Sequence, residues 1–156
     1  MLLFLKNLSF TLIVPGSVAV IVPLYAFAHS ELVFSAFALI GGVLLLAGGL
    51  IYLWCVWDFG VTGRGTPAPI DPAKQLVIRG LYAYGRNPMY VGVLSVIFGW
   101  AFLFRSVSIT IYGGCVAIGF HLFVLLYEEP YLERVFGSSY KHYCSQVNRW
   151  LPTRKG

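Results

Sequence analysis

Two apolar runs separated by a very short polar link constrain this chain more than any other feature. The first run begins after Arg86-Asn87-Pro88 and ends near Phe104, and the second begins near Val107 and ends at Glu128-Glu129. A link as short as Arg105-Ser106 must return the second run to the side that the first one left. The arginine and the two carboxylates are therefore expected at the same end of a helical hairpin, close enough to share a site.

The composition is typical of a membrane protein. Of the 156 residues, 58% are hydrophobic and 11% are charged, whereas soluble domains carry about 25% charged residues. A helix needs about 20 apolar residues to cross a hydrocarbon core of roughly 30 Å. We predict an all-α integral membrane protein whose four transmembrane helices are Leu8–Ala28, Leu32–Trp57, Met89–Phe104 and Val107–Tyr127.

The charge distribution predicts the orientation. With four spans, both termini and the connection 58–87 share one side, and every Lys and Arg except Arg105 lies there. The positive-inside rule makes this side cytoplasmic. The net charge of +5 then reflects topology and attraction to anionic headgroups, so the lipid bilayer is the expected partner and nucleic acid is not. A cleaved signal peptide ending at Ala26-Phe27-Ala28 is an alternative, but the first run is longer than the usual ~7–15-residue core.

We predict a single membrane domain, 1–156, in three parts. Residues 1–57 form two N-terminal spans, 58–87 form a cytoplasmic loop with the first polar cluster, and 88–156 form the hairpin and a C-terminal tail. The stretch Gly63–Pro72 is rich in proline and glycine, which exclude helix and strand. Pro88 suits the first turn of the third span.

The C-terminal tail is expected to be helical and to lie along the membrane surface. Pro130 should leave the Leu126 carbonyl free or kink the helix, and Gly137 should end it. Ser138 is predicted to cap a second short helix. Its apolar positions follow helical spacing and either anchor the tail or line the site: Tyr140, Tyr143 and Val147.

Small residues in the second run predict close helix packing. Ser35, Gly42 and Gly49 recur every seven residues, with Gly41 and Gly48 beside them. Such a stripe lets helices approach closely within lipid.

The cysteines and histidines predict neither a disulfide framework nor a metal site. They are scattered, and no Cys-x-x-Cys pair occurs. His121, deep in the fourth run, is expected to pack or to form a helix–helix hydrogen bond.

Residue chemistry alone leaves two interpretations of the polar clusters open. Glu128 and Glu129 opposite Arg86 can form a structural ion pair at the membrane interface. The same charges, in a chain that has so few, can instead bind a charged small molecule at a lipid–water boundary.

Two sequence blocks resemble a known family. Leu76-Val77-Ile78-Arg79-Gly80-Leu81-Tyr82 and Arg86-Asn87-Pro88-Met89-Tyr90-Val91-Gly92 resemble the first signature of the isoprenylcysteine carboxyl methyltransferases, and phospholipid N-methyltransferases carry a similar one. The second signature is similar to the following residues: Glu128-Glu129-Pro130-Tyr131-Leu132, Phe136-Gly137, Tyr140, Tyr143 and Val147-Asn148-Arg149-Trp150-Leu151-Pro152. The resemblance spans roughly Gly65 to Pro152, which is over half of the chain.

The resemblance implies an integral-membrane methyltransferase that uses S-adenosylmethionine as its methyl donor and acts on a hydrophobic or lipid-linked acceptor. We expect catalytic roles for Arg86, Glu129 and Arg149. The expected cofactor-binding residues are Gln75, Gly80, Tyr82, Arg86, Asn87, Pro88, Tyr90, Glu128 and Glu129. Adjacent helical residues point about 100° apart, and we favour Glu129 for the more direct contact.

One departure from the family bears on the acceptor. The residue after Arg86 is often histidine in the family and is Asn87 here, so one candidate base is replaced by a neutral hydrogen-bonding group. A carboxylate acceptor is nucleophilic without a base and is favoured over an amine, which must first be deprotonated. The alternatives are a phospholipid N-methyltransferase, a nicotinamide-dependent reductase of the sterol-reductase type, and a non-enzymatic membrane scaffold.

Overall fold

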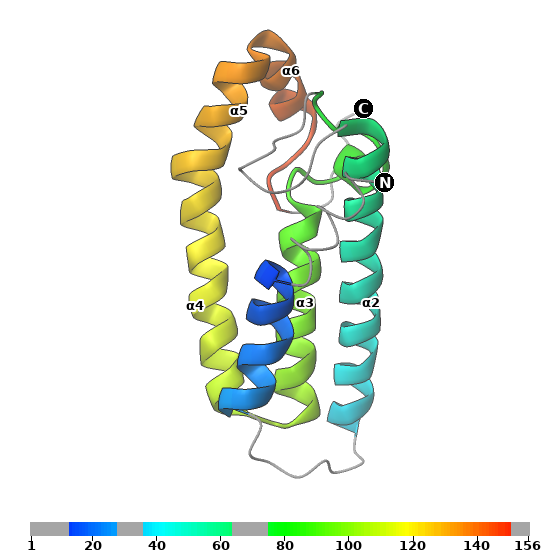
Figure 1. Cartoon of the computed structure of the whole chain (residues 1–156), viewed down its shortest axis with the longest axis vertical. Coiled ribbons are helices and arrows are strands. Elements are labelled where there is room, and N and C mark those ends of the chain that lie inside the picture. Colours follow the sequence, from blue (N-terminus) through cyan, green and yellow to red (C-terminus); the bar gives the residue numbers. More distant parts are fainter. Residues whose placement is uncertain (1–12, 28–35, 64–74, 151–156) are drawn as a thin grey trace.

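The computed structural model describes residues 13–27, 36–63 and 75–150, and every element in these ranges is helical, which confirms the all-α fold. Figure 1 shows long helices side by side, with a short helical cap at one end. The first helix, Ile13–Tyr25, is followed by these elements: α2 (Ala36–Asp58), extended by η3 (Phe59–Gly63), then η4 (Gly80–Ala83), α3 (Pro88–Leu103), α4 (Val107–Phe123), η5 (Val124–Glu128), α5 (Glu129–Phe136) and α6 (Ser138–Gln146).

Glycines hold α2 and α3 in close contact. A Cβ added at Gly41 would lie 2.8 Å from the Gly99 carbonyl oxygen, and one at Gly48 would lie 2.6 Å from the Gly92 carbonyl oxygen. Side chains larger than hydrogen would push the two backbones apart. The predicted close packing is therefore present, but it uses Gly41 and Gly48. The neighbouring Gly42 and Gly49 have no atom within 4 Å of such a Cβ.

The hairpin between α3 and α4 forms as the sequence predicts. Arg105 adopts a left-handed backbone conformation with φ of 49°, which reverses the chain at the lower end of Figure 1. The Ser106 hydroxyl then accepts a hydrogen bond from the Ile109 N–H at 3.3 Å, capping the start of α4. At the other end, Pro88 occupies the first turn of α3, where its missing N–H costs nothing.

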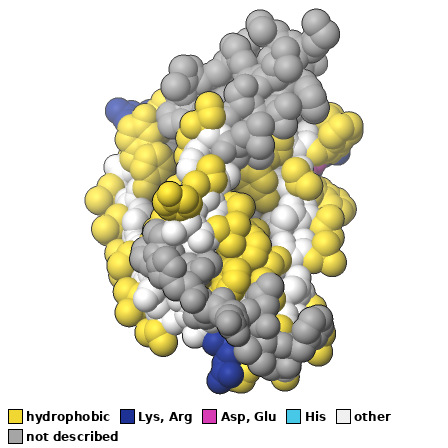
Figure 2. All heavy atoms as spheres, turned by 60° about the horizontal axis from the view of Figure 1, so that its bottom comes forward, with side chains coloured by type: hydrophobic (Ala, Val, Ile, Leu, Met, Phe, Trp, Pro, Cys, Tyr) yellow, Lys and Arg dark blue, Asp and Glu magenta, His cyan; other side chains and the backbone are white. Residues whose placement is uncertain are grey.

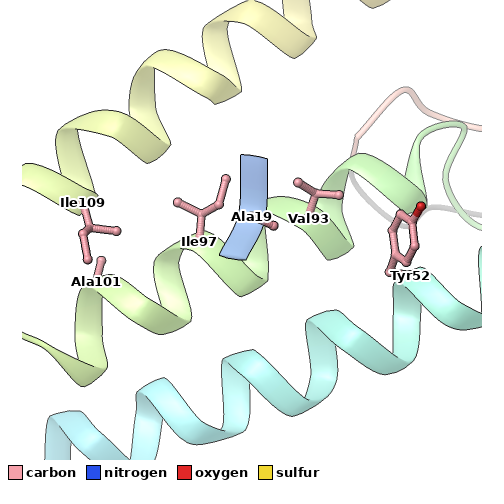
Figure 3. Close-up of a cluster of buried hydrophobic side chains, with 6 residues drawn as sticks. All are labelled: Ala19, Tyr52, Val93, Ile97, Ala101 and Ile109. Carbon is pink, nitrogen blue, oxygen red and sulfur yellow. The ribbon is translucent and has the colours of Figure 1, made fainter. Parts of the chain in front are cut away.

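The first helix completes a small apolar core. Ala19 lies against α3 in Figure 3, together with buried side chains of α2, α3 and α4: Tyr52, Val93, Ile97, Ala101 and Ile109. The Tyr112 hydroxyl of α4 donates to the Val18 carbonyl at 2.9 Å, which ties the first helix to the hairpin.

The outer surface remains strongly apolar. Figure 2 shows a face dominated by hydrophobic side chains, with Lys and Arg confined to its edges. Two continuous helices, Ala36–Thr62 and Val107–Phe136, are long and apolar enough to cross a membrane, whereas Ile13–Tyr25 and Pro88–Leu103 are apolar but shorter. Exposed side chains such as Leu39 at 71% and Leu126 at 70% match a lipid environment.

Pro130 does not break the helix that contains it. The chain remains helical from α4 through η5 into α5, and the Glu129 N–H donates to the Val124 carbonyl five residues earlier. This is a wider, π-type turn of the kind that occurs within α-helices. Gly137, with φ of 53°, ends α5 as predicted. The predicted cap by Ser138 is wrong: Gly137 is the N-cap residue of α6 and no side chain caps this helix.

The apolar face of α6 packs inside the protein. Tyr140, Tyr143 and Val147 are buried together, and Leu76, Leu132 and Phe136 pack against them. The helical spacing was therefore a correct guide to this face. Several sequence predictions fall outside the described residues, including most of the Gly63–Pro72 loop and Ser35.

Candidate active site

One carboxylate and two guanidinium groups meet at the polar end of the hairpin. Arg149 donates from Nε and Nη2 to the two oxygens of Glu129, at 2.7 and 2.8 Å. Arg86 Nη1 lies 3.0 Å from Glu129 Oε1. The Arg86 and Glu129 side chains are only 12% and 17% exposed, so the ion pairs are shielded from water and are stronger than surface pairs.

Backbone contacts bring these residues together across a long stretch of sequence. The Arg86 N–H donates to the Asn148 carbonyl at 3.0 Å, and Asn87 Nδ2 donates to the Arg149 carbonyl at 3.1 Å. Two hydrogen bonds thus fasten the segment before α3 to the segment after α6. The Asn87 amide fixes the backbone here and does not cap α3.

Tyrosine hydroxyls support the same region. The Tyr143 hydroxyl donates to the Tyr82 carbonyl at 2.6 Å, in a buried position. Burial raises the pKa of Tyr143 and of Tyr82 above the usual tyrosine value, so both remain protonated donors. The bond joins α6 to η4, which leads into Arg86.

The two glutamates have different partners. Glu129 is held by both arginines, and its hydrogen bonds raise the pKa of the Arg149 guanidinium. Glu128 accepts a hydrogen bond from the Tyr90 hydroxyl at 2.7 Å. As predicted, the side chains of these two adjacent residues point in different directions. Glu128 contacts α3, and Glu129 contacts the C-terminal segment.

Aromatic rings cover the Tyr90–Glu128 contact. The Tyr90 ring lies 4.7 Å from that of Phe120 and 6.5 Å from that of Trp150, between ring centroids. Trp150 Nε1 donates to His121 Nδ1 at 3.2 Å. His121 therefore forms a hydrogen bond, but to the non-helical segment after α6 and not to another helix as one expectation had it.

Buried polar atoms without a partner among the described residues mark where a ligand can be held. Arg86 Nε is one of them, although Nη1 of the same group contacts Glu129 and also Cys144 Sγ at 2.6 Å. A buried N–H is costly to leave unpaired. It offers a donor to an anionic group next to the acids.

A further acid at this end, besides Glu128 and Glu129, was missed by sequence reasoning. Asp58, at the end of α2, is 1% exposed and pairs with Arg79 at 3.1 Å. Its Oδ2 lies against Gly80, where any Cβ would overlap it. The signal was present in the sequence, because Asp58 is a carboxylate at the end of a long apolar run.

The predicted cofactor-binding residues do not all contact the ion pairs. Gly80 lies against Asp58, and Tyr82 is buried with its ring 5.5 Å from that of Phe59. Gln75 is exposed. The structure brings together five of them, Arg86, Asn87, Tyr90, Glu128 and Glu129, with Arg149, which was predicted to be catalytic.

Comparison with known proteins identifies the family of this chain. The model of the phospholipid methyltransferase family matches residues 37–139, which is more than half of the chain. The chain belongs to the phospholipid methyltransferase family. This family is one of methyltransferases, and the family together with the long apolar helices indicates a membrane protein. This membership confirms the resemblance drawn from the two sequence blocks.

A curated relative matches part of the chain. Protein-S-isoprenylcysteine O-methyltransferase of Schizosaccharomyces pombe is 35% identical over 77 residues, which is 49% of this chain and 33% of the yeast protein. The match thus spans about a third of the length of that relative. No solved structure matches the chain significantly.

Proposed function

We propose that this protein transfers a methyl group from S-adenosylmethionine to the carboxylate of a hydrophobic or lipid-linked acceptor. The observation that carries the proposal is the convergence of Arg86, Glu129 and Arg149 at the polar end of a methyltransferase-family hairpin. The partly matching relative, an isoprenylcysteine O-methyltransferase, supports the choice of a carboxylate.

The charges at this end suit the methyl donor. Glu128 can attract the donor's positive groups or accept its hydroxyls, while Arg86 Nε can donate to its carboxylate. When bound, adenosylmethionine supplies a methyl group on positively charged sulfur, and the acceptor oxygen bonds to that carbon as the carbon–sulfur bond breaks and sulfur keeps the electron pair. The protein's own task is to align the reactants and exclude water.

The ion pairs favour an acceptor that is already ionised. Glu129 is held by two guanidinium groups, which stabilise its charged form and make it a weak base. Asn87 cannot accept a proton in the usual pH range. Arg86 or Arg149 can orient an anionic head. An amine acceptor would instead need Glu128 as its base, because Glu129 is already paired with both arginines.

The phospholipid N-methyltransferase is the second candidate, and the family name itself favours it. Methyl transfer to a prenylcysteine analogue, to phosphatidylethanolamine and to a small water-soluble acid, measured side by side, separates the possibilities. We expect best turnover on the prenylcysteine analogue. Transfer only to phosphatidylethanolamine would establish the N-methyltransferase, and best turnover on the soluble acid would refute a lipid-linked acceptor.

We also propose that all four apolar helices cross the membrane and that the polar end and both termini face the cytoplasm. The charged side chains of the described residues gather at the end of α2, the start of α3 and the α5–α6 cap, with Arg105 opposite. This distribution follows the positive-inside rule.

A further inference from the structure

Asp58 is a buried acid to which the proposed function gives no role. Its side chain, at the end of α2, is only 1% exposed. One oxygen pairs with Arg79 Nε at 3.1 Å. The other, Oδ2, is shielded from water and has no hydrogen-bond partner in the part of the chain that the structure describes. A buried polar atom without a partner is costly and is rarely kept unless it has a role.

Stability alone does not explain this ion pair. Taking a carboxylate out of water is costly, and the ion pair offsets this cost only when further hydrogen bonds satisfy the remaining atoms. Arg79 is 54% exposed and contacts one oxygen of Asp58. Buried pairs of this kind are often neutral or unfavourable for stability compared with uncharged side chains, and in some proteins they fix one conformation instead. The pair is therefore better explained by where it holds the chain.

The ion pair fastens residues 79–86 to the end of α2. Asp58 Oδ2 occupies the space that a side chain at residue 80 would fill, and Gly80 has φ of 59°. Only glycine adopts this conformation readily and lets the backbone approach the carboxylate so closely. Next to it, Tyr82 is buried in one cluster with Cys55 of α2. The segment is therefore fixed against α2 by charge, by backbone conformation and by packing.

The same segment leads directly to the charged site. Its Tyr82 carbonyl accepts the hydrogen bond from the Tyr143 hydroxyl at 2.6 Å. At its end, the Arg86 N–H donates to the Asn148 carbonyl at 3.0 Å, and the Arg86 guanidinium pairs with Glu129. The end of α2 thus holds one side of the segment, and the C-terminal part of the chain holds the other.

We infer that Asp58 is a positioning residue for the proposed methyl-donor site. Through Arg79 and Gly80 it fixes residues 79–86, and so it sets where Arg86 meets the donor. The inference rests on the proposed function and extends that site to the end of α2. Asp58 acts through the segment and does not itself touch the donor. Its loss should therefore change the affinity for adenosylmethionine more than the stability of the fold.

Asp58→Asn tests the inference, because it removes the charge and keeps the shape of the side chain. Titration of the full protein in nanodiscs should give a Kd for adenosylmethionine about fivefold higher than that of the wild type. The kcat for a prenylcysteine analogue at saturating donor should be unchanged, as expected when only binding is weakened. The unfolding temperature should be unchanged or higher, because a buried charge is removed. A merely structural role predicts the opposite, a lower unfolding temperature with an unchanged Kd.

Two further variants show whether the effect belongs to the ion pair. Arg79→Ala should raise the Kd to a similar extent, and the double variant with Asp58→Asn should be no worse than either single one, because the two residues act as a unit. Arg134→Ala is the matched control. It removes an arginine that is exposed on α5 and bonds only a backbone carbonyl among the described residues, so it should leave the Kd unchanged.

Hydrogen–deuterium exchange measures the position of the segment without any ligand. Hydrogen bonds within the segment include those from the Tyr82 N–H to the Arg79 carbonyl and from the Gly85 N–H to the Leu81 carbonyl. In Asp58→Asn the amides of residues 79–86 should exchange about fivefold faster, and those of α3 and α4 should not change. If either the exchange or the Kd is unchanged in a folded Asp58→Asn variant, the inference is wrong.

The proposed function and this inference fail in different ways. A folded wild type that binds no adenosylmethionine contradicts the proposed function, and the exchange measurement still decides whether Asp58 fixes the segment. A wild type that binds the donor and transfers the methyl group, with an Asp58→Asn variant that behaves identically, overturns the inference alone.

Discussion

Arg149 holds both carboxylate oxygens of Glu129, at 2.7 and 2.8 Å. This contact joins the segment after α6 to the start of α5, and Arg86 adds a third contact from the segment before α3. The site is therefore closed by residues from three separate parts of the chain. Loss of the Glu129 carboxylate would leave two half-buried guanidinium groups close together with no negative charge to neutralise them.

Glu129→Gln is expected to weaken adenosylmethionine binding. The amide cannot neutralise two guanidinium groups, so Arg86 and Arg149 should separate and the site should lose its order. A loss of about 1–3 kcal/mol is expected for charge-assisted hydrogen bonds. Calorimetric titration of the purified protein measures it.

Glu133→Gln is the matched control for that substitution. Glu133 lies one turn further along α5, is 51% exposed and pairs with Lys141 at the surface. Exposed pairs contribute little, so its adenosylmethionine affinity should equal that of the wild type. Wild-type affinity in a folded Glu129→Gln variant would show that Glu129 is not part of the adenosylmethionine site.

Tyr90→Phe is expected to destabilise the protein and to reduce methyl transfer. The change removes the hydroxyl that donates to Glu128, leaving a shielded carboxylate without that donor. We expect a loss of about 1–3 kcal/mol in the free energy of unfolding. Tyr127→Phe, at a ring that is 48% exposed, should have little effect. Equal thermal unfolding curves for the two variants would show that the Tyr90 hydroxyl is not needed.

Gly48→Ala is expected to separate α2 from α3. The new Cβ would lie 2.6 Å from a backbone oxygen, and backbone cannot move aside as a side chain can. Overpacking of this kind costs about 1–3 kcal/mol. Gly49→Ala, one residue away with open space around its Cβ, should leave stability unchanged or raise it. Thermal unfolding in detergent compares them, and equal destabilisation by both would contradict the interface.

Helical spacing and short connections made much of the fold predictable. The link Arg105-Ser106 required a hairpin, and the hairpin placed Arg86 near Glu129. The face of α6 that contains Tyr140 and Tyr143 followed from their spacing. These features depend on local sequence and on helix geometry.

Features that depend on contacts between distant segments were not predictable. Gly41 and Gly42 are both small and adjacent, so only the orientation of α2 against α3 decides which one is buried. Ser138 is a good capping residue, but Gly137 already occupies the capping position because its positive φ ends α5. Asp58 could be noted as a carboxylate at the end of an apolar run, but its contact with Gly80 depends on a distant segment that returns to it.

The proposed orientation can be mapped with single engineered cysteines in intact cells. Positions near Arg64 and Arg154 should be protected from a membrane-impermeant thiol reagent, and a position near Glu31 should be labelled, because most basic residues lie on the protected side. Labelling near Arg64 and Arg154 with protection near Glu31 would show that the orientation is the opposite of the proposed one.

Binding of the methyl donor tests the central claim most directly. The purified protein, in nanodiscs, is titrated with adenosylmethionine and, separately, with a nicotinamide dinucleotide, and the same samples are assayed for labelled methyl transfer to a prenylcysteine analogue. We predict saturable adenosylmethionine binding that Glu129→Gln weakens, no competing nicotinamide dinucleotide binding, and methyl transfer to the analogue. A folded protein that does not bind adenosylmethionine, or that binds the dinucleotide in its place, would contradict the account.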